Sequence, residues 1–342
     1  MNRSLTRRIL GATAAALVAV ATAASLAACG GPSAAADAGS PTSGGTLVPL
    51  KVGAPWNGTA GKTPTDTGTF GYAVEKGLAE PILEKYGFTY EGFAAFNNGP
   101  PVVQALESGD IQVGLIGDTP AAQAKASGID VPALSIAKPS SDIWFLGKVG
   151  GGVESVADLK GKTVGLQFGS NFDKYGRAVL EKAGILKDVK IVNLLFADAL
   201  PALQRGDIDA VPLPATTAGI WRLTDDFPVI SKASEDDPEL LATSVALTSR
   251  EAADAHPKIA EAVWAVQQAG IDAIQSDHDA YAAWVEQATG APKAVVLAAN
   301  TWKFGTERLD PDGLKTVQST LDYLVDNGTA PRAFDVATWG LQ

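Results

Sequence analysis

Cysteine, histidine and methionine are the scarcest residues of this 342-residue chain, which has one Cys, two His and one Met. The only Cys is Cys29, close to the N-terminus, so no second thiol is present for a disulfide or a thiolate metal site. His256 and His278 stand apart, and the sequence has no paired-His metal motif, no Gly-x-Ser-x-Gly elbow and no phosphate-binding loop. These absences predict a protein that uses neither metal nor cofactor and is held together by packing.

Basic side chains are also in the minority. The chain has 27 Lys and Arg against 38 Asp and Glu, which gives a formal net charge of -11. Such an acidic balance excludes nucleic acid as an expected partner. A small anionic ligand stays compatible with it, because helix N-termini and backbone N–H groups bind anions without any cationic side chain.

The N-terminal residues have the pattern of an export signal. Three Arg among the first eight residues precede an apolar, Ala-rich stretch over residues 9–28, as in the basic region and apolar core of a signal peptide. Residues 26–29, LAAC, resemble the lipobox of bacterial lipoproteins, whose Cys becomes the lipidated first residue of the mature protein. We expect a signal peptide over residues 1–28 and an extracytoplasmic protein anchored to the cell membrane by a lipid on Cys29. An uncleaved signal anchor and either the Sec or the twin-arginine route remain open.

A short segment of the chain occurs twice. ALESGDIQV at residues 105–113 recurs as ALQRGDIDA at residues 202–210. In each copy an apolar helical stretch stops at Gly and an apolar run follows, which indicates helix, turn and strand. A generic Gly-Asp turn is the alternative interpretation. Two such units predict two doubly wound α/β lobes with a cleft at the carboxyl ends of their strands.

Apolar periodicity and turn residues along the rest of the chain predict the order of the helices and strands and their division between two lobes. Residues 29–46 are rich in Gly, Pro, Ser, Ala and Thr and predict a flexible linker. Strands are predicted at 50–53, 88–96, 111–116, 131–137, 143–149, 163–167, 189–195, 208–213 and 245–249, and helices at 69–86, after 98, after 119, from 170 to 184, around 200–204, and at 257–274, 279–289 and 311–324. We expect lobe 1 to comprise residues 47–141 and 246–342 and lobe 2 residues 142–245, with hinge strands near 137–148 and 242–250.

Several short motifs in this order carry a family resemblance. GPP at residues 99–101, GDTPA at 117–121, VADLKGK at 156–162 and GDIDA at 206–210 together resemble the solute-binding proteins of ABC importers for aliphatic sulfonates, taurine and nitrate. The resemblance implies a periplasmic-binding-protein type 2 fold, a helical C-terminal part packed on the first lobe, and a monomer that closes on its ligand and delivers it to a membrane permease. Many sulfonate binders have a Trp where residues 211–214 read VPLP, which leaves the exact ligand open.

The candidate binding residues lie in loops at strand ends. Thr119, and Ser170 with Asn171, begin helices in opposite lobes, so their side chains and adjacent N–H groups are expected to close on an oxyanion. Asp118 is expected either to meet an ammonium, as on taurine, or to cap its own helix. The other candidates are loop residues that supply a wall or a polar contact: Trp56, Asn57, Asn98, Ser140, Ser141, Gly169, Pro214 and Thr216.

The function expected from these patterns is binding without catalysis. We expect a lipid-anchored receptor that captures a small sulfonate or related oxyanion compound and hands it to an ABC permease. An enzyme of the pyrimidine-synthase-like branch of the same fold is the competing class, but these loops lack the reactive His and Cys that such enzymes need. A binding protein for nitrate or a thiamine precursor, and a receptor that feeds a sensor, also remain open.

Overall fold

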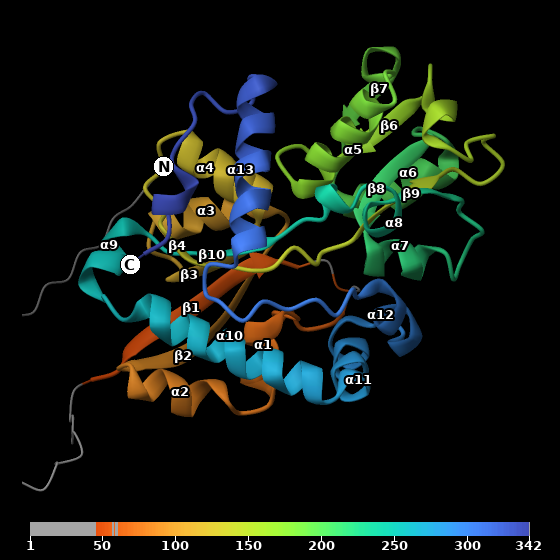
Figure 1. Ribbon diagram of the computed structural model, residues 1–342. Helices are drawn as coiled ribbons and strands as arrows, with labels where there is room; N and C mark the ends of the chain where they lie inside the picture. The colour runs from red at the N-terminus through yellow and green to blue at the C-terminus, as the bar shows by residue number, and fades with distance from the viewer. Residues whose placement is uncertain (1–45, 57, 59–60, 342) are drawn as a thin grey trace, which may run out of the picture. The chain divides into compact units, whose positions relative to one another are not determined.

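Two five-stranded sheets organise the chain. The structure is a computed structural model that describes residues 46–56, 58 and 61–341, so the predicted signal peptide and Cys29 lie outside the described residues. The strand orders are β2-β1-β3-β10-β4 and β7-β6-β8-β5-β9 (Figure 1). In both sheets three parallel strands are followed by an antiparallel one, so the second sheet repeats the pattern of the first.

The strands are short and occur along the chain in the predicted order. The first sheet contains β1 (Val48–Pro55), β2 (Phe88–Phe96), β3 (Val113–Gly117), β4 (Ala133–Ile136) and β10 (Ser244–Leu247). The second contains β5 (Ile143–Gly147), β6 (Thr163–Leu166), β7 (Lys190–Asn193), β8 (Ala210–Pro214) and β9 (Val229–Lys232). Only β9 has no counterpart among the predicted strands.

The helices complete both α/β units. Those that connect strands are α1 (Thr69–Glu75), α2 (Ala79–Lys85), α3 (Gly99–Glu107), α4 (Asp118–Ala126), α5 (Asn171–Lys182), α6 (Phe196–Arg205), α7 (Ala215–Trp221) and α8 (Ala233–Asp236). The C-terminal part contains α9 (Arg250–Ala255), α10 (Ile259–Ser276), α11 (His278–Thr289), α12 (Lys293–Ala299) and α13 (Pro311–Asp326). Among the described residues, none of these helices combines the length and the hydropathy needed to cross a bilayer.

The repeated segment forms the same unit in both sheets. In the first copy α3 ends before Gly109, whose φ is 77°, and β3 follows; in the second α6 ends at Gly206, whose φ is 80°, and β8 follows. Glycine adopts this left-handed conformation without steric cost, which is why both helices stop there. The predicted helix–turn–strand repeat is confirmed.

Each sheet buries side chains on both faces. Along β10, Val245 and Leu247 face a core with α3, α4 and α13, whereas Ala246 faces a second core with α1, α2 and α10. In the second sheet, Phe145 and Leu146 of β5 divide in the same way between two cores. This alternation follows from the period of two along a strand, and it is the burial expected of doubly wound sheets.

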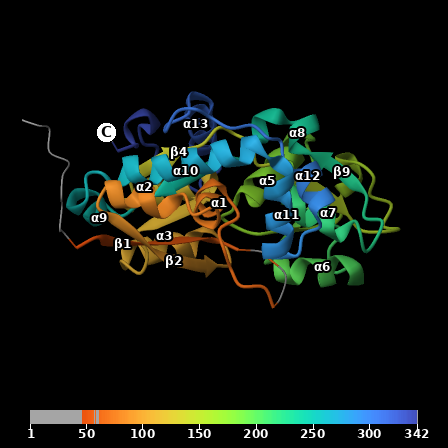
Figure 2. The same cartoon turned by 90° about the horizontal axis from the view of Figure 1, so that it is seen from below.

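One predicted helix is wrong in its length. The stretch 69–86 was expected to be a single helix, but it forms α1 and α2 with a break at Gly77, whose φ is 69°. A left-handed residue interrupts the helical hydrogen-bond ladder, so the chain turns there. Both short helices pack against the long α10, as the view from below shows (Figure 2).

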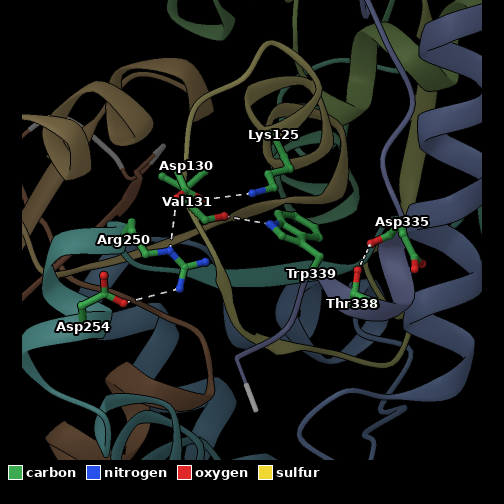
Figure 3. A network of polar contacts seen from close by, with 8 residues as sticks. All are labelled: Lys125, Asp130, Val131, Arg250, Asp254, Asp335, Thr338 and Trp339. Atoms are coloured by element: carbon green, nitrogen blue, oxygen red, sulfur yellow. Dashed lines mark hydrogen bonds and ion pairs between the residues drawn. The ribbon is translucent and has the colours of Figure 1, made fainter.

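The C-terminal segment is hydrogen-bonded to the loop that follows α4 (Figure 3). The indole N–H of Trp339 donates to the carbonyl oxygen of Val131 over 2.7 Å. Next to it, the carboxylate of Asp130 pairs with Lys125 at 3.0 Å and with Arg250 of α9 at 3.1 Å. Helix α13 packs on α4, so the C-terminal part covers the first sheet as predicted.

Candidate functional site

A cavity of about 330 Å³ lies at the carboxyl ends of four parallel strands. Pro55 ends β1, Gly117 ends β3, Gln167 directly follows β6 and Pro214 ends β8, and all four line the cavity. Open α/β sheets bind ligands at these strand ends. The other lining residues are Ala54, Asp66, Gly68, Thr69, Phe70, Asn97, Asn98, Gly99, Leu115, Ile116, Pro120, Ser141, Asp142, Ile143, Ser170, Asn171, Phe172, Phe196, Ala242, Thr243, Ser244 and Gln267.

The lining contains carboxylates and amides but no Lys, Arg or His among the described residues. Phe70, Phe172 and Phe196 supply aromatic walls. An anion in this cavity therefore has only backbone N–H groups, hydroxyls and side-chain amides as donors. Helix N-termini provide such donors with a favourable dipole.

The N-terminus of α5 opens onto the cavity. The Ser170 hydroxyl donates to the Gln167 carbonyl oxygen over 2.5 Å and accepts from the Asp173 N–H over 3.3 Å, so it caps the helix. Among the described residues, the N–H groups of Asn171 and Phe172 have no hydrogen-bond partner. These two N–H groups, at the positive end of a helix of 12 residues, form a candidate anion-binding position of the site.

Asp118 is the centre of a buried polar network and does not line the cavity. Its side chain is fully buried and pairs with the ammonium of Lys174 at 3.4 Å. It also accepts from the Asn171 amide over 2.7 Å, from the Thr243 N–H over 3.0 Å and from the Thr320 hydroxyl. The network joins α4 to α5 and α13, so the carboxylate has structural partners from both sheet units.

The start of α4 is already occupied by α5. The Asp118 N–H donates to the Thr243 carbonyl oxygen and the Thr119 N–H donates to the Asn171 Oδ1 over 3.1 Å, while Pro120 has no N–H. Thr119 does not cap α4: Gly117 is the N-cap residue, and the Asn171 side chain accepts from the Thr119 N–H at the helix start. The Thr119 Oγ1 is buried, has no hydrogen-bond partner among the described residues and does not line the cavity.

The other predicted residues divide between the cavity and its surroundings. Asn98, Ser141, Ser170, Asn171 and Pro214 line the cavity. Ser140 lines a neighbouring cavity of about 280 Å³, which shares Ser141 and Gln267 with the first.

Three further predicted positions lie elsewhere, and a fourth cannot be placed. Trp56 is half-buried with its ring over Gly58, and Gly169 lies beside Gln123 and Pro100. Neither they nor Thr216 line the main cavity. Asn57 lies outside the described residues.

The sequence reasoning missed eight polar residues of the lining: Asp66, Thr69, Asn97, Asp142, Gln167, Thr243, Ser244 and Gln267. Gln167 follows a predicted strand directly, so its position at a strand end was a usable signal. Asp66 precedes α1 in a stretch without periodicity, and Gln267 sits on the long amphipathic α10, where helical spacing indicates core packing. Only the tertiary structure brings these two to the cavity.

The sequence matches the model of the family described as NMT1/THI5 like over residues 68–280, which is more than half of the chain. The chain belongs to the NMT1/THI5-like family. The match begins just before α1 and ends within α11, so it includes every strand except β1.

Curated relatives of this NMT1/THI5-like chain are named as binding proteins. A putative aliphatic sulfonates-binding protein of Escherichia coli is 32% identical over 147 residues, which is 42% of this chain and 45% of the relative. The taurine-binding periplasmic protein of the same organism is 30% identical over 212 residues, 59% of this chain and 62% of the relative. The aligned part thus spans about half the length of the first of these relatives.

Solved structures share the fold. The periplasmic aliphatic sulphonate-binding protein SsuA of Escherichia coli superposes with a TM-score of 0.69 at 23% identity, covering 86% of this chain and 98% of that chain. The predicted two-lobed periplasmic-binding-protein fold is confirmed. The desulfurization enzyme DszB also shares it, with a TM-score of 0.60 at 15% identity over 86% of this chain and 96% of that chain. The fold alone therefore does not separate binding from catalysis.

Proposed function

We propose that this protein is the extracytoplasmic solute-binding component of an ABC importer and that it captures a small sulfonate or related oxyanion compound in the main cavity. The curated relatives support the solute class, since two are named for aliphatic sulfonates and for taurine. Delivery to a permease, and an anchor through a lipid on Cys29, are parts of the same proposal.

The observation that carries the proposal is a pair of N–H groups at the start of α5 that have no partner among the described residues, in a cavity whose described lining has no cationic side chain. The N–H groups of Asn171 and Phe172 are the donors that we assign to the oxyanion. Fixed backbone donors at a helix N-terminus bind a sulfonate or carboxylate without the desolvation of a Lys or Arg. The side-chain amide of Asn98, at the start of α3, lies in the same lining and adds a polar contact.

We propose that the cavity lies between two lobes that move about two crossings of the chain. The antiparallel bridge between Ser141 and Ala242 places the two connecting segments side by side, close to the predicted lobe boundaries. β10 begins at Ser244, two residues before the predicted return to lobe 1 at 246. Closure on a ligand then requires that the solute binds the closed state more tightly than the open one.

A solute panel tests this function, and mass spectrometry of the recovered solute controls for chemical conversion. Taurine, ethanesulfonate, isethionate, nitrate and an aminopyrimidine are titrated by calorimetry, and thermal unfolding is followed at each concentration. A ligand present at a hundredfold excess over its Kd raises stability by about 2.7 kcal/mol, and a sulfonate is expected to do so. The absence of saturable binding by every sulfonate would overturn the proposal, and conversion of the recovered solute would favour the enzyme class.

A further inference from the structure

One carboxylate in the cavity wall has no cation. Asp66 is half-buried, and its two oxygens accept from the N–H groups of Gly68 and Gly71, each over 2.8 Å. None of the ion pairs among the described residues includes Asp66. Burial raises the pKa of this carboxyl, although its two backbone hydrogen bonds lower it. The charge is therefore poorly compensated within the protein.

A second carboxylate of the same lining provides the contrast. Asp142 accepts four hydrogen bonds: from the N–H groups of Ile143 and Ser234, from the Trp144 indole and from the Ser234 hydroxyl. An ionised carboxylate has about four acceptor positions, so those of Asp142 are filled. Within the part of the chain that the structure describes, Asp66 accepts two hydrogen bonds, which leaves acceptor capacity for another partner.

Other acceptors in the lining are also without donors. The side-chain N–H of Gln167 donates to the Asn97 carbonyl oxygen over 3.2 Å, which fixes the orientation of the amide and leaves its Oε1 as an acceptor. This Oε1 is buried without a partner among the described residues, and so is the Oδ1 of Asn98. Buried acceptors of this kind cost free energy until a donor reaches them. The lining therefore favours a ligand that brings donors of its own.

We propose that Asp66 binds a cationic nitrogen of the solute, so that the preferred ligand is a zwitterion with a protonated nitrogen as well as an oxyanion. The inference rests on the proposed function and specifies its ligand class. The oxyanion contacts the N–H groups at the start of α5, and the nitrogen lies at the β1–α1 loop that carries Asp66. A plain anion would meet two carboxylates and no cationic side chain in this lining, which is repulsive at short range.

Pairs of solutes that differ only at the nitrogen test this inference. Taurine is compared with ethanesulfonate and isethionate, and β-alanine with propionate, by calorimetry on the full-length chain at neutral pH. Charge-assisted hydrogen bonds are about twice as strong as neutral ones, and we expect the amino compound of a pair to bind about tenfold more tightly or better. The Asp66→Asn variant is expected to lose this preference while it still binds the sulfonate. The matched Asp142→Asn variant, at a carboxylate whose acceptors are filled, is expected to keep it.

The outcomes separate the inference from the function on which it rests. Equal affinities of wild-type protein for taurine and ethanesulfonate overturn the inference and leave sulfonate binding intact. Binding of β-alanine but of no sulfonate, lost in Asp66→Asn, overturns the sulfonate class and supports the role of Asp66. Failure of all amino compounds to bind overturns the inference as well. The comparison of solutes on wild-type protein decides the question even if Asp66→Asn, which weakens the start of α1, folds poorly.

Discussion

Removing the ammonium from the buried pair of Asp118 and Lys174 is expected to destabilise the protein strongly. The Asp118 side chain is 0% exposed and that of Lys174 is 6% exposed. Lys174→Met keeps most of the apolar stem but leaves the carboxylate without its cation. Loss of one partner of a buried pair costs about 3–5 kcal/mol. Because Asn171, Thr243 and Thr320 still donate to Asp118, we expect the lower end, about 3 kcal/mol.

The matched control is Lys125→Met on the neighbouring α4. Lys125 pairs with Asp130 at 3.0 Å, but the two side chains are 26% and 52% exposed, and exposed pairs contribute about 0–1 kcal/mol. Equilibrium urea unfolding, followed by tryptophan fluorescence, gives the free energy for both variants. A loss in Lys174→Met no larger than that in Lys125→Met would refute the reasoning.

A double-mutant cycle separates the pair from the packing around it. Asp118→Asn alone also leaves a buried charge, now on Lys174, and should destabilise the protein as well. The double variant Asp118→Asn, Lys174→Met removes both charges, so its loss should be smaller than the two single losses together by about 1–3 kcal/mol. Strict additivity would show that the two groups do not interact across the network.

Four further variants test other parts of the structure. Gly117→Ala places a Cβ 2.3 Å from the Asn171 Oδ1, so it should lower stability by about 1–3 kcal/mol, and less in an Asn171→Ala background; equal losses in both backgrounds would contradict this contact. Thr119→Val replaces a buried hydroxyl that has no partner among the described residues by a methyl group and should raise the free energy of unfolding by about 1 kcal/mol. Ser170→Ala removes a helix cap and should lower the free energy of unfolding by about as much. Burial, and then the charge of Asp66, raise the pKa of Tyr90 to about 12. Because the folded protein holds the phenol proton more tightly than the unfolded chain does, the free energy of unfolding should fall as pH rises from 10 towards 12. Tyr90→Phe should lose this part of the pH dependence.

Local signals predicted the scaffold well. The two copies of the Gly-Asp segment predicted both helix–turn–strand units, because a helix stop at Gly and an apolar run after it depend on neighbouring residues alone. Residues 69–86 show the limit of such signals: the apolar pattern continues through Gly77, and only its left-handed conformation in the folded chain divides the stretch into α1 and α2.

The sequence predicted the location of the site better than the role of each residue in it. Strand-end reasoning found Asn98, Ser141, Ser170, Asn171 and Pro214, which all line the cavity. It also selected Asp118 and Thr119, because helix starts after strands are good anion sites in general. Their surroundings depend on Asn171, Lys174 and Thr320, which come from distant parts of the sequence.

The sequence by itself determined the doubly wound architecture, its internal repeat and the edge of the sheets where a ligand belongs, because helix stops, apolar periodicity and strand ends are local properties. The tertiary structure decided which polar groups are hydrogen-bonded within the protein and which remain available to a ligand. At the start of α4 the Asp118 N–H is bonded to Thr243 and the Thr119 N–H to Asn171, whereas two N–H groups at the start of α5 have no partner among the described residues. The fold also brings Asp66 to a cavity whose described lining has no cationic side chain. Such pairing depends on contacts between residues far apart in the chain, which no local pattern records.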